Sequence, residues 1–480
     1  MNIRIYNAKI LTMSDYPDMS IIDGEIIIEG NKIKKIGTKE PSPVPFDREI
    51  DAHGNLVMPG FKNAHSHSPM AFARSFADDL PLDRWLNEKI FPLEGKLTDS
   101  DINLFTKISL LEYISGGITA TFDMYFRPEN IVEAALEFGF REVICGAVND
   151  FVESVARMES FYDLYNKRNS FSANSSGSHS DSASLISYKL GFHAEYTTNE
   201  SLLKDIAALA HDKNAPVYCH NSETKSEVAG CIARHGATPV TYLDSLGMFD
   251  YGGGGFHMIY TDNNDLDIIR KRGIHVVSCP ASNGKLASGM IPMYKYLAGK
   301  GSESVGTVPS DSFFAHPNGI PNLQTQRMSH SEPSPLTHGI NIALGTDGPA
   351  SNNALSMFRE MYLTSIYQKL YTENAAAMDA DRVLYMATVG GAKAMGLTDC
   401  DTLSEGKYAD LIMIDLNTPN MQPVNNITKN LVYSGDTSNV IMTMINGNIL
   451  YEKGEFYIGG KSYDTQKLYN EANKRMEHLK

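Results

Sequence analysis

Short runs rich in Ile and other apolar residues, bounded by polar or turn residues, occupy both ends of the chain. Near the start, two such runs are joined by a Gly-Asn turn, and near the end two more are joined by an Asn-Gly turn, which is typical of a β-hairpin. The expected strands are residues 3–6, 25–29, 32–36, 409–414, 442–445 and 448–451. Because an isolated hairpin is marginally stable in water, we expect both ends to pack together into one small composite β-sandwich.

Between the ends, strand-like runs alternate with stretches whose apolar residues recur at helical spacing, as in βα units around a parallel sheet. The expected helix and strand pairs are 101–115 with 120–123, 199–212 with 216–220, and 262–273 with 274–278, followed by a late strand at 341–347. This order predicts an α/β fold, a (β/α)8 TIM-type barrel, with its active site at the carboxyl ends of the strands. We expect the barrel at 56–400 and the β-sandwich at 1–55 and 401–480, the latter with a C-terminal tail.

Two polar stretches interrupt this alternation, at about 168–186 and 301–337. Both are rich in Ser, Gly, Asn and Pro and cannot bury much apolar surface. We expect both to be mobile surface loops. The histidines in or beside them are expected to be exposed bystanders: His179, His316, His330 and His338.

The chain has 480 residues and a formal charge of -15 at pH 7. Nucleic acids and anionic membranes are bound by clustered Lys and Arg, so this charge argues against both kinds of partner. Residues 1–5 contain no basic segment followed by an apolar stretch, and nowhere do about 18 apolar residues run together. We expect a soluble cytoplasmic protein.

The five cysteines are scattered and form no Cys-x-x-Cys pair. They are Cys145, Cys219, Cys231, Cys279 and Cys400. This pattern argues against a disulfide framework and against a cysteine-based zinc site. We expect reduced thiols, mostly buried.

An apolar run delivers two histidines, His65 and His67, and then ends. Side chains in a strand alternate faces, so both imidazoles project to one side while Ser66 projects to the other. Two imidazoles on one face can bind one first-row metal ion, but a catalytic zinc normally needs at least one more protein ligand and an open position for water.

Other strand ends offer the missing ligands: His220 and Asp347 each close a predicted strand, and His257 follows another. In a barrel these ends converge on one mouth. We therefore expect His65, His67, His220 and Asp347 to bind a single divalent metal ion. Zn2+ is the first choice, and Fe2+ and Mn2+ also suit such ligands.

Glu223 stands three residues beyond His220, in the loop entering the next helix. A metal ion can lower the pKa of bound water toward about 7 and so supply hydroxide. Attack on an aromatic amidine carbon also needs a proton at the ring nitrogen and later at the leaving amine. A carboxyl group beside the metal can shuttle that proton.

Four segments carry a resemblance to a known family: 59–67 (PGFKNAHSH), 220–224 (HNSET), 278–283 (SCPASN) and 345–353 (GTDGPASNN). Together they resemble the amidohydrolase superfamily, and within it most the 5'-methylthioadenosine/S-adenosylhomocysteine deaminases. The resemblance covers nearly the whole chain outside the two polar stretches. It implies one metal ion on the four ligands proposed above, since no lysine ends the strand at 190–192, where binuclear relatives carry a carboxylated one.

The resemblance also implies roles for individual residues. Glu223 is then the proton shuttle, His257 orients the hydroxide and the tetrahedral intermediate, and Asp347 accepts a proton from the metal-bound water. Glu94 matches the family position that binds the ribose hydroxyls, and His193 matches the histidine that contacts the purine.

The sequence departs from this family at the end of the substrate that carries the 5' group. S-adenosylhomocysteine deaminases hold the homocysteine carboxylate with arginines, and the first of these aligns with Gly146. The second would fall after Asp150, where Arg157 is only a loose match. Because charge-assisted arginine pairs are among the stronger contacts, we expect methylthioadenosine, adenosine or 5'-deoxyadenosine to be better substrates than S-adenosylhomocysteine.

The expected function is hydrolytic deamination of an adenine nucleoside to the inosine analogue and ammonia. A homo-oligomer is left open as the assembly. One alternative is a guanine deaminase or a triazine-type aminohydrolase of the same superfamily, for which Glu94 would have no ribose diol to bind. A non-catalytic scaffold is a further alternative, because fold alone does not establish function.

Overall fold

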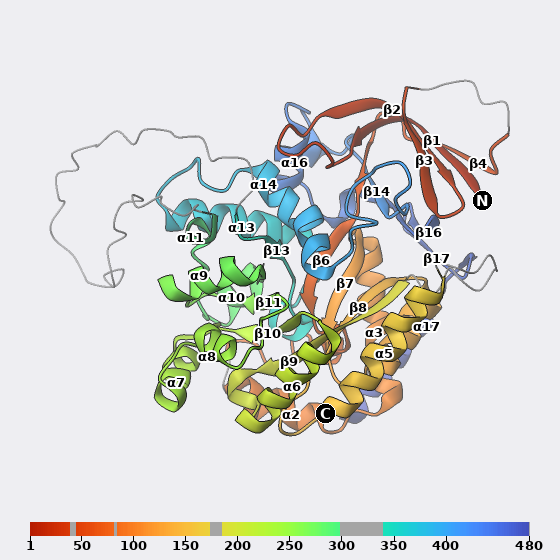
Figure 1. Cartoon of the computed structure of the whole chain (residues 1–480). Coiled ribbons are helices and arrows are strands. Elements are labelled where there is room, and N and C mark those ends of the chain that lie inside the picture. The colour runs from red at the N-terminus through yellow and green to blue at the C-terminus, as the bar shows by residue number, and fades with distance from the viewer. Residues whose placement is uncertain (39–44, 81–83, 173–184, 298–338, 480) are drawn as a thin grey trace, which may run out of the picture.

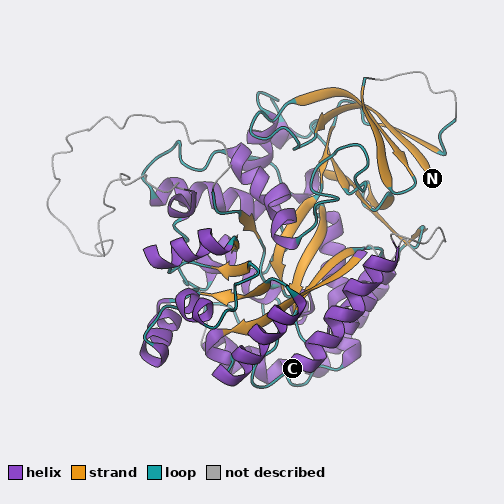
Figure 2. Ribbon diagram, viewed as in Figure 1, coloured by secondary structure: helices purple, strands orange, loops and turns teal. Residues whose placement is uncertain are grey.

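A computed structural model describes residues 1–38, 45–80, 84–172, 185–297 and 339–479. Its centre is a sheet of eight parallel strands that follow one another in chain order, and the last strand lies against the first. Helices cover the outside of this nearly closed barrel (Figures 1 and 2). The strands are β6 (Phe61–Ser66), β7 (Ile118–Met124), β8 (Arg141–Cys145), β9 (Ile186–Ala194), β10 (Val217–Asn221), β11 (Gly253–His257), β12 (Ile274–Ser278) and β13 (Ile342–Leu344). The predicted TIM-type barrel is confirmed.

Capping residues and a glycine mark the ends of two barrel helices. Asn199 caps α6 by accepting a hydrogen bond from the amide of Leu202, and Asp262 caps α9. Gly273 ends α9 with φ 67°, a left-handed conformation that glycine adopts at least cost. The helices are α2 (Phe91–Glu94), α3 (Asp99–Ser115), α4 (Pro128–Phe138), α5 (Val155–Ser172), α6 (Glu200–Lys213), α7 (Lys225–His235), α8 (Pro239–Ser245), α9 (Asn263–Arg272), α10 (Pro280–Lys285), α11 (Met293–Leu297), α12 (Pro349–Asn352), α13 (Met357–Tyr371), α14 (Ala380–Tyr385) and α15 (Gly391–Met395). Two 3-10 helices are η1 (Ser68–Ala73) and η4 (Glu195–Thr197), and two π-helices are η2 (Trp85–Ile90) and η5 (Met386–Gly390).

Both chain ends contribute to a second, separate sheet of ten strands (Figure 1). Its strands are β1 (Asn2–Leu11), β2 (Ile21–Glu29), β3 (Lys32–Gly37), β4 (Arg48–Asp51), β5 (Leu56–Pro59), β14 (Leu411–Ile414), β15 (Val440–Ile445), β16 (Asn448–Glu452), β17 (Glu455–Ile458) and β18 (Lys461–Ser462). The join lies at β5, which pairs with β1 on one side and with β14 on the other. Residues 56–59, which we expected in the barrel, therefore belong to this sheet, and the change to the barrel comes at Gly60.

The second sheet has a hydrophobic core of its own. This core contains buried residues from both chain ends, such as Ile26, Val57, Leu411 and Met442. The C-terminal segment adds α16 (Ile427–Tyr433), the turns η6 (Pro419–Met421) and η7 (Thr437–Asn439), and α17 (Thr465–Leu479). The last helix is tied to the barrel by two hydrogen bonds from Arg475 to Asp101.

Two expectations about the chain's interruptions meet different outcomes. Residues 168–172 were expected in a loop but continue α5, because an established helix adds one hydrogen bond for each further residue. The remainder of the first polar stretch up to residue 184, and all of the second, lie outside the described residues, as do the four histidines we expected to be bystanders. All five cysteines are buried and free, as predicted. No helix in the described part of the chain is long and apolar enough to cross a membrane.

Candidate metal centre and active site

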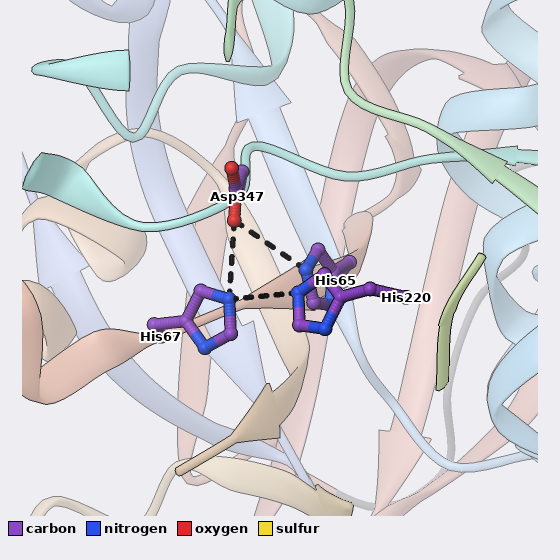
Figure 3. Close-up of side chains that lie close together, drawn as sticks. All are labelled: His65, His67, His220 and Asp347. Atoms are coloured by element: carbon purple, nitrogen blue, oxygen red, sulfur yellow. Dashed lines mark hydrogen bonds and ion pairs between the residues drawn. The ribbon is translucent and has the colours of Figure 1, made fainter. Parts of the chain in front are cut away.

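Four side chains meet at the carboxyl end of the barrel. His65 lies in β6, His67 directly follows it, His220 lies in β10, and Asp347 stands three residues beyond β13. One potential ligand atom of each lies within 4.8 Å of the others. Figure 3 shows these side chains pointing toward a common centre. The structure therefore brings together all four residues that the sequence predicted as ligands.

Hydrogen bonds fix the ring orientation of two of these histidines. The Nδ1 group of His67 donates to the carbonyl oxygen of Met124, and Nδ1 of His220 donates to the carbonyl oxygen of His193 at 2.8 Å. Each ring then presents the lone pair of Nε2, and the two Nε2 atoms lie 3.3 Å apart. Among the described residues, neither ring nitrogen of the buried His65 has a hydrogen-bond partner. Nitrogen lone pairs that face each other with no hydrogen-bond donor between them are well placed to bind one shared cation.

The electrostatics of the cluster suit a cation as well. Burial lowers the pKa of His65 to about 3 and lowers the pKa of His220 well below its usual value, so both rings are neutral. Burial would raise the pKa of Asp347, but the adjacent imidazoles of His65 and His67 outweigh this effect and hold the pKa well below its usual value. Oδ1 of Asp347 lies 3.4 Å from His65 Nε2 and 3.2 Å from His67 Nε2. Imidazole nitrogens and one carboxylate fit a divalent first-row metal ion.

Glu223 and His257 lie beside this cluster, and both are buried. Glu223 stands two residues beyond β10, where burial raises the pKa of its carboxyl group. Its Oε1 accepts a hydrogen bond of 2.9 Å from Ser288, and its Oε2 lies 3.8 Å from His257 Nε2. His257 ends β11 with a left-handed φ of 72° and shares a hydrogen bond of 2.8 Å with the side chain of Asn283. Such backbone strain is common at functional sites.

One cavity of about 700 Å³ opens onto the cluster and reaches Glu94 and His193. Glu94 ends α2 and accepts a hydrogen bond of 2.6 Å from the Tyr125 hydroxyl, and burial raises its pKa to about 7. Burial lowers the pKa of His193 to about 4, so this ring is neutral. A buried carboxyl group and a neutral imidazole thus face the cavity that leads to the metal cluster.

Residue 146 is a glycine, and the structure leaves little room for a side chain there. A Cβ atom on Gly146 would lie 2.7 Å from the carbonyl oxygen of Gly191 and 2.7 Å from the sulfur of Met158. Arg157 does line the cavity, but its guanidinium is paired with Glu129 at 2.5 Å. The space in which the aligned arginine of the resembled deaminases would begin is therefore filled.

The cavity is also lined by Arg127, which the sequence did not single out. Its guanidinium donates to the carbonyl oxygen of Leu97 at 2.9 Å and lies 3.2 Å from Asp99. Both arginines that line the cavity, Arg127 and Arg157, therefore already have acceptors within the protein.

Comparisons with known proteins agree with this arrangement. The model of the amidohydrolase family matches residues 56–312 and 322–450. The chain belongs to the amidohydrolase family. It is 34% identical over 480 residues to a 5-methylthioadenosine/S-adenosylhomocysteine deaminase of Caldanaerobacter subterraneus subsp. tengcongensis, covering 100% of this chain and 99% of the relative.

Two further proteins are similar along almost the full length. A 5'-deoxyadenosine deaminase of Methanobrevibacter smithii is 31% identical over 483 residues, covering 100% of this chain and 98% of the relative. The crystal structure of an adenosine deaminase from Xanthomonas campestris with bound zinc superposes with a TM-score of 0.82 at 27% identity, covering 99% of this chain and 98% of that one. The amidohydrolase described here is thus a hydrolytic enzyme, as the sequence predicted.

Some residues of this amidohydrolase site were missed by the sequence analysis. Ser282 and Ser351 donate hydrogen bonds of 2.6 Å and 2.8 Å to Oδ2 of Asp347. Asn283 and Ser288 contact His257 and Glu223, as described above. The sequence did contain a signal for Ser282 and Asn283. Both lie in segment 278–283, which carries part of the resemblance, and both come shortly after β12, at the end of the barrel where active sites lie.

Proposed function

We propose that this amidohydrolase hydrolytically deaminates an adenine nucleoside, yielding the inosine analogue and ammonia. The observation that carries the proposal is the single cavity that joins the four-residue metal cluster and Glu223 to Glu94 and His193. A nucleoside offers one group for each part: an amidine carbon for the cluster, a purine ring for His193 and a ribose diol for Glu94. The full-length similarity to proteins named as deaminases of adenine nucleosides supports the same substrate class.

The ion we propose for the cluster is Zn2+, held by His65, His67, His220 and Asp347. When bound, such an ion lowers the pKa of a water molecule toward about 7 and so supplies hydroxide at neutral pH. Zinc in the similar adenosine deaminase structure supports this choice over Fe2+ or Mn2+. The hydroxyls of Ser282 and Ser351 hold Oδ2 of Asp347, so Oδ1 stays directed at the histidines.

We assign proton transfer to Glu223. Its burial raises the pKa of the carboxyl group, which lets the group hold a proton closer to neutral pH and release it to the substrate. In the proposed reaction this proton goes to N1 of the adenine ring as oxygen adds to C6, and a second proton goes to the amino group before ammonia leaves. His257, 3.8 Å from Glu223, lies where it can orient the group that attacks C6.

We assign substrate binding to Glu94 and His193. A carboxylate can accept hydrogen bonds from two adjacent hydroxyl groups, one at each oxygen, so Glu94 suits the 2' and 3' hydroxyls of ribose. His193 is neutral, and its backbone carbonyl oxygen accepts a hydrogen bond from His220, one of the proposed metal ligands. It therefore suits contact with an uncharged purine ring beside the ion.

For the 5' group we propose a small, uncharged substituent, as in 5'-methylthioadenosine, adenosine or 5'-deoxyadenosine. The filled space at Gly146 and the acceptors already held by Arg127 and Arg157 support this preference over S-adenosylhomocysteine. Aromatic and apolar side chains at the same cavity, including Trp85 and Phe126, suit a methylthio group.

The test is ammonia release by the zinc-loaded protein with these four nucleosides and guanine in parallel. We expect turnover of the three nucleosides with small 5' groups, a lower kcat/KM for S-adenosylhomocysteine, and no turnover of guanine. Glu223→Gln is the matched control, because it keeps the size of the side chain and removes the transferable proton. Turnover of guanine alone would overturn the proposal, and a higher kcat/KM for S-adenosylhomocysteine than for methylthioadenosine would overturn the assigned 5' preference.

A further inference from the structure

The loop at 279–289, which contains α10, contacts three groups of the proposed site. Each contact is a side-chain hydrogen bond of 2.6 to 2.9 Å. The pairs are Ser282 with Asp347, Asn283 with His257, and Ser288 with Glu223. The third pair touches the group that we assign to proton transfer.

The backbone of Ser288 is held firmly. Its amide donates a hydrogen bond of 2.9 Å to the carbonyl oxygen of Asn283, and its carbonyl oxygen accepts one of 2.7 Å from the Tyr260 hydroxyl. The next residue, Gly289, has φ 137° and packs so tightly that a Cβ atom would lie 2.4 Å from that hydroxyl. Ser288 itself is 5% exposed. Its hydroxyl is therefore presented to Glu223 from a fixed position.

Glu223 is fixed at its other end as well. Its backbone amide donates a hydrogen bond of 2.7 Å to Oε2 of Glu227, whose Oε1 accepts the amide of Ser222 at 2.7 Å. With the main chain held by Glu227 and Oε1 held by Ser288, Oε2 of Glu223 is directed toward His257. The two oxygens of the same carboxyl group thus have different surroundings.

We propose that Ser288 is a positioning residue that reserves Oε1 of Glu223 as a hydrogen-bond acceptor and leaves Oε2 as the oxygen that carries the transferred proton. A protonated carboxyl group has one O–H donor, and an oxygen that already accepts a hydroxyl proton is the poorer site for it. The proton taken up at Oε2 leaves from Oε2 to the substrate, which restores the carboxylate, while Ser288 keeps its own proton throughout. This inference rests on the proposed function, which assigns proton transfer to Glu223.

The test compares Ser288→Ala with Ser288→Thr, which retains the hydroxyl. We expect kcat of Ser288→Ala for methylthioadenosine to fall by about tenfold or more, as part of the 10²–10⁴-fold that a positioned acid or base contributes, with little change in KM or zinc content. The lost hydrogen bond also raises the pKa of Glu223, so the alkaline limb of the kcat profile, where the protonated carboxyl group is lost, moves to higher pH. Ser288→Thr should restore both properties.

The matched control is Ser278→Ala, a serine in the same region whose buried hydroxyl has no hydrogen-bond partner among the described residues. It should leave kcat and the pH profile unchanged. The inference would be overturned if Ser288→Ala had the kcat and pH profile of the wild-type protein. It would also be overturned if zinc-loaded Ser288→Thr were as impaired as Ser288→Ala. If the wild-type protein deaminates no nucleoside, the proposed function fails. A carbon NMR titration of the Glu223 carboxyl in both proteins then decides the inference, and an equal pKa would overturn it.

Discussion

The backbone amide of Asp347 donates a hydrogen bond of 3.0 Å to the carbonyl oxygen of His65, so the first and last barrel strands are joined at the metal cluster itself. One residue earlier, the amide of Thr346 donates to the side chain of Asn63 at 2.8 Å. Gly345 permits this approach, because a Cβ atom there would lie 2.7 Å from the His65 amide nitrogen. Closure of the barrel and assembly of the ligands therefore depend on the same contacts.

Replacing Gly345 by alanine should weaken both properties. The added methyl group meets backbone atoms that cannot rotate away, and such overpacking typically costs about 1–3 kcal/mol. We expect a lower free energy of unfolding by denaturant titration and weaker zinc binding by competition with a chelator. Gly339→Ala is the matched control, since no atom of the described residues lies within 4 Å of its Cβ position. Equal zinc affinity in the two variants would contradict the proposed role of the contacts between Gly345 and His65 in assembling the metal ligands.

Removing the metal should destabilise the folded protein. An ion that binds only the folded state at a free concentration of 100 times its Kd contributes about 2.7 kcal/mol, so chelation should lower the unfolding temperature measured by calorimetry. In His220→Gln we expect a smaller response to zinc, because one of the four ligands is lost. An unfolding temperature that does not depend on zinc in the wild-type protein would argue against the metal centre.

Replacing Glu94 by alanine should impair turnover of nucleosides. Hydrogen bonds to a charged group contribute about 1.5–3 kcal/mol each, so we expect kcat/KM for methylthioadenosine to fall by at least about tenfold. Tyr125→Phe, which removes only the hydroxyl that donates to Glu94, should have a smaller effect. If Glu94→Ala retained wild-type kcat/KM, its assignment to the ribose hydroxyls would be wrong.

The buried ion pair of Arg141 and Asp410 should make stability depend on pH in the acid range. Its two hydrogen bonds, of 2.6 Å and 3.0 Å, link β8 of the barrel to the residue before β14. Burial alone would raise the pKa of Asp410, but the charge and hydrogen bonds of Arg141 lower it. The contribution of this carboxylate is therefore present above its unfolded pKa of about 3.9 and is lost as pH falls through its lower folded pKa.

Variants of this pair test that sign. Asp410→Asn leaves a buried guanidinium without its counter-charge, which typically costs about 3–5 kcal/mol, and it should flatten the acid part of a plot of unfolding free energy against pH. The double variant with Arg141→Met and Asp410→Leu should recover part of the loss at neutral pH, because it removes both charges of the pair together. If the unfolding free energy of Asp410→Asn fell with acid pH as steeply as that of the wild-type protein, groups other than Asp410 would control the acid stability.

Local patterns were enough to predict much of this protein. Turn dipeptides marked the terminal hairpins, the helical spacing of apolar residues marked the barrel helices, and alternation in a strand placed His65 and His67 on one face. The periodicity of apolar residues does not show where one domain ends and the next begins. We therefore assigned β5 to the barrel, although it pairs with β1 and β14 of the second sheet.

Contacts between distant segments could not be predicted in this way. Ser288 reaches Glu223 over 65 residues, and nothing in either segment announces that hydrogen bond. The fit of Met158 and Gly191 against Gly146 likewise depends on how α5 and β9 pack. The sequence showed a missing arginine at residue 146, and only the structure shows that its space is filled.

The most direct test of the central claim is to incubate the zinc-loaded protein with 5'-methylthioadenosine in water labelled with heavy oxygen and to identify the products by mass spectrometry. Hydrolytic deamination predicts 5'-methylthioinosine with one labelled oxygen at C6 and an equal amount of ammonia, both absent with Glu223→Gln. Release of free adenine, or an unchanged nucleoside in the presence of bound zinc, would contradict the account.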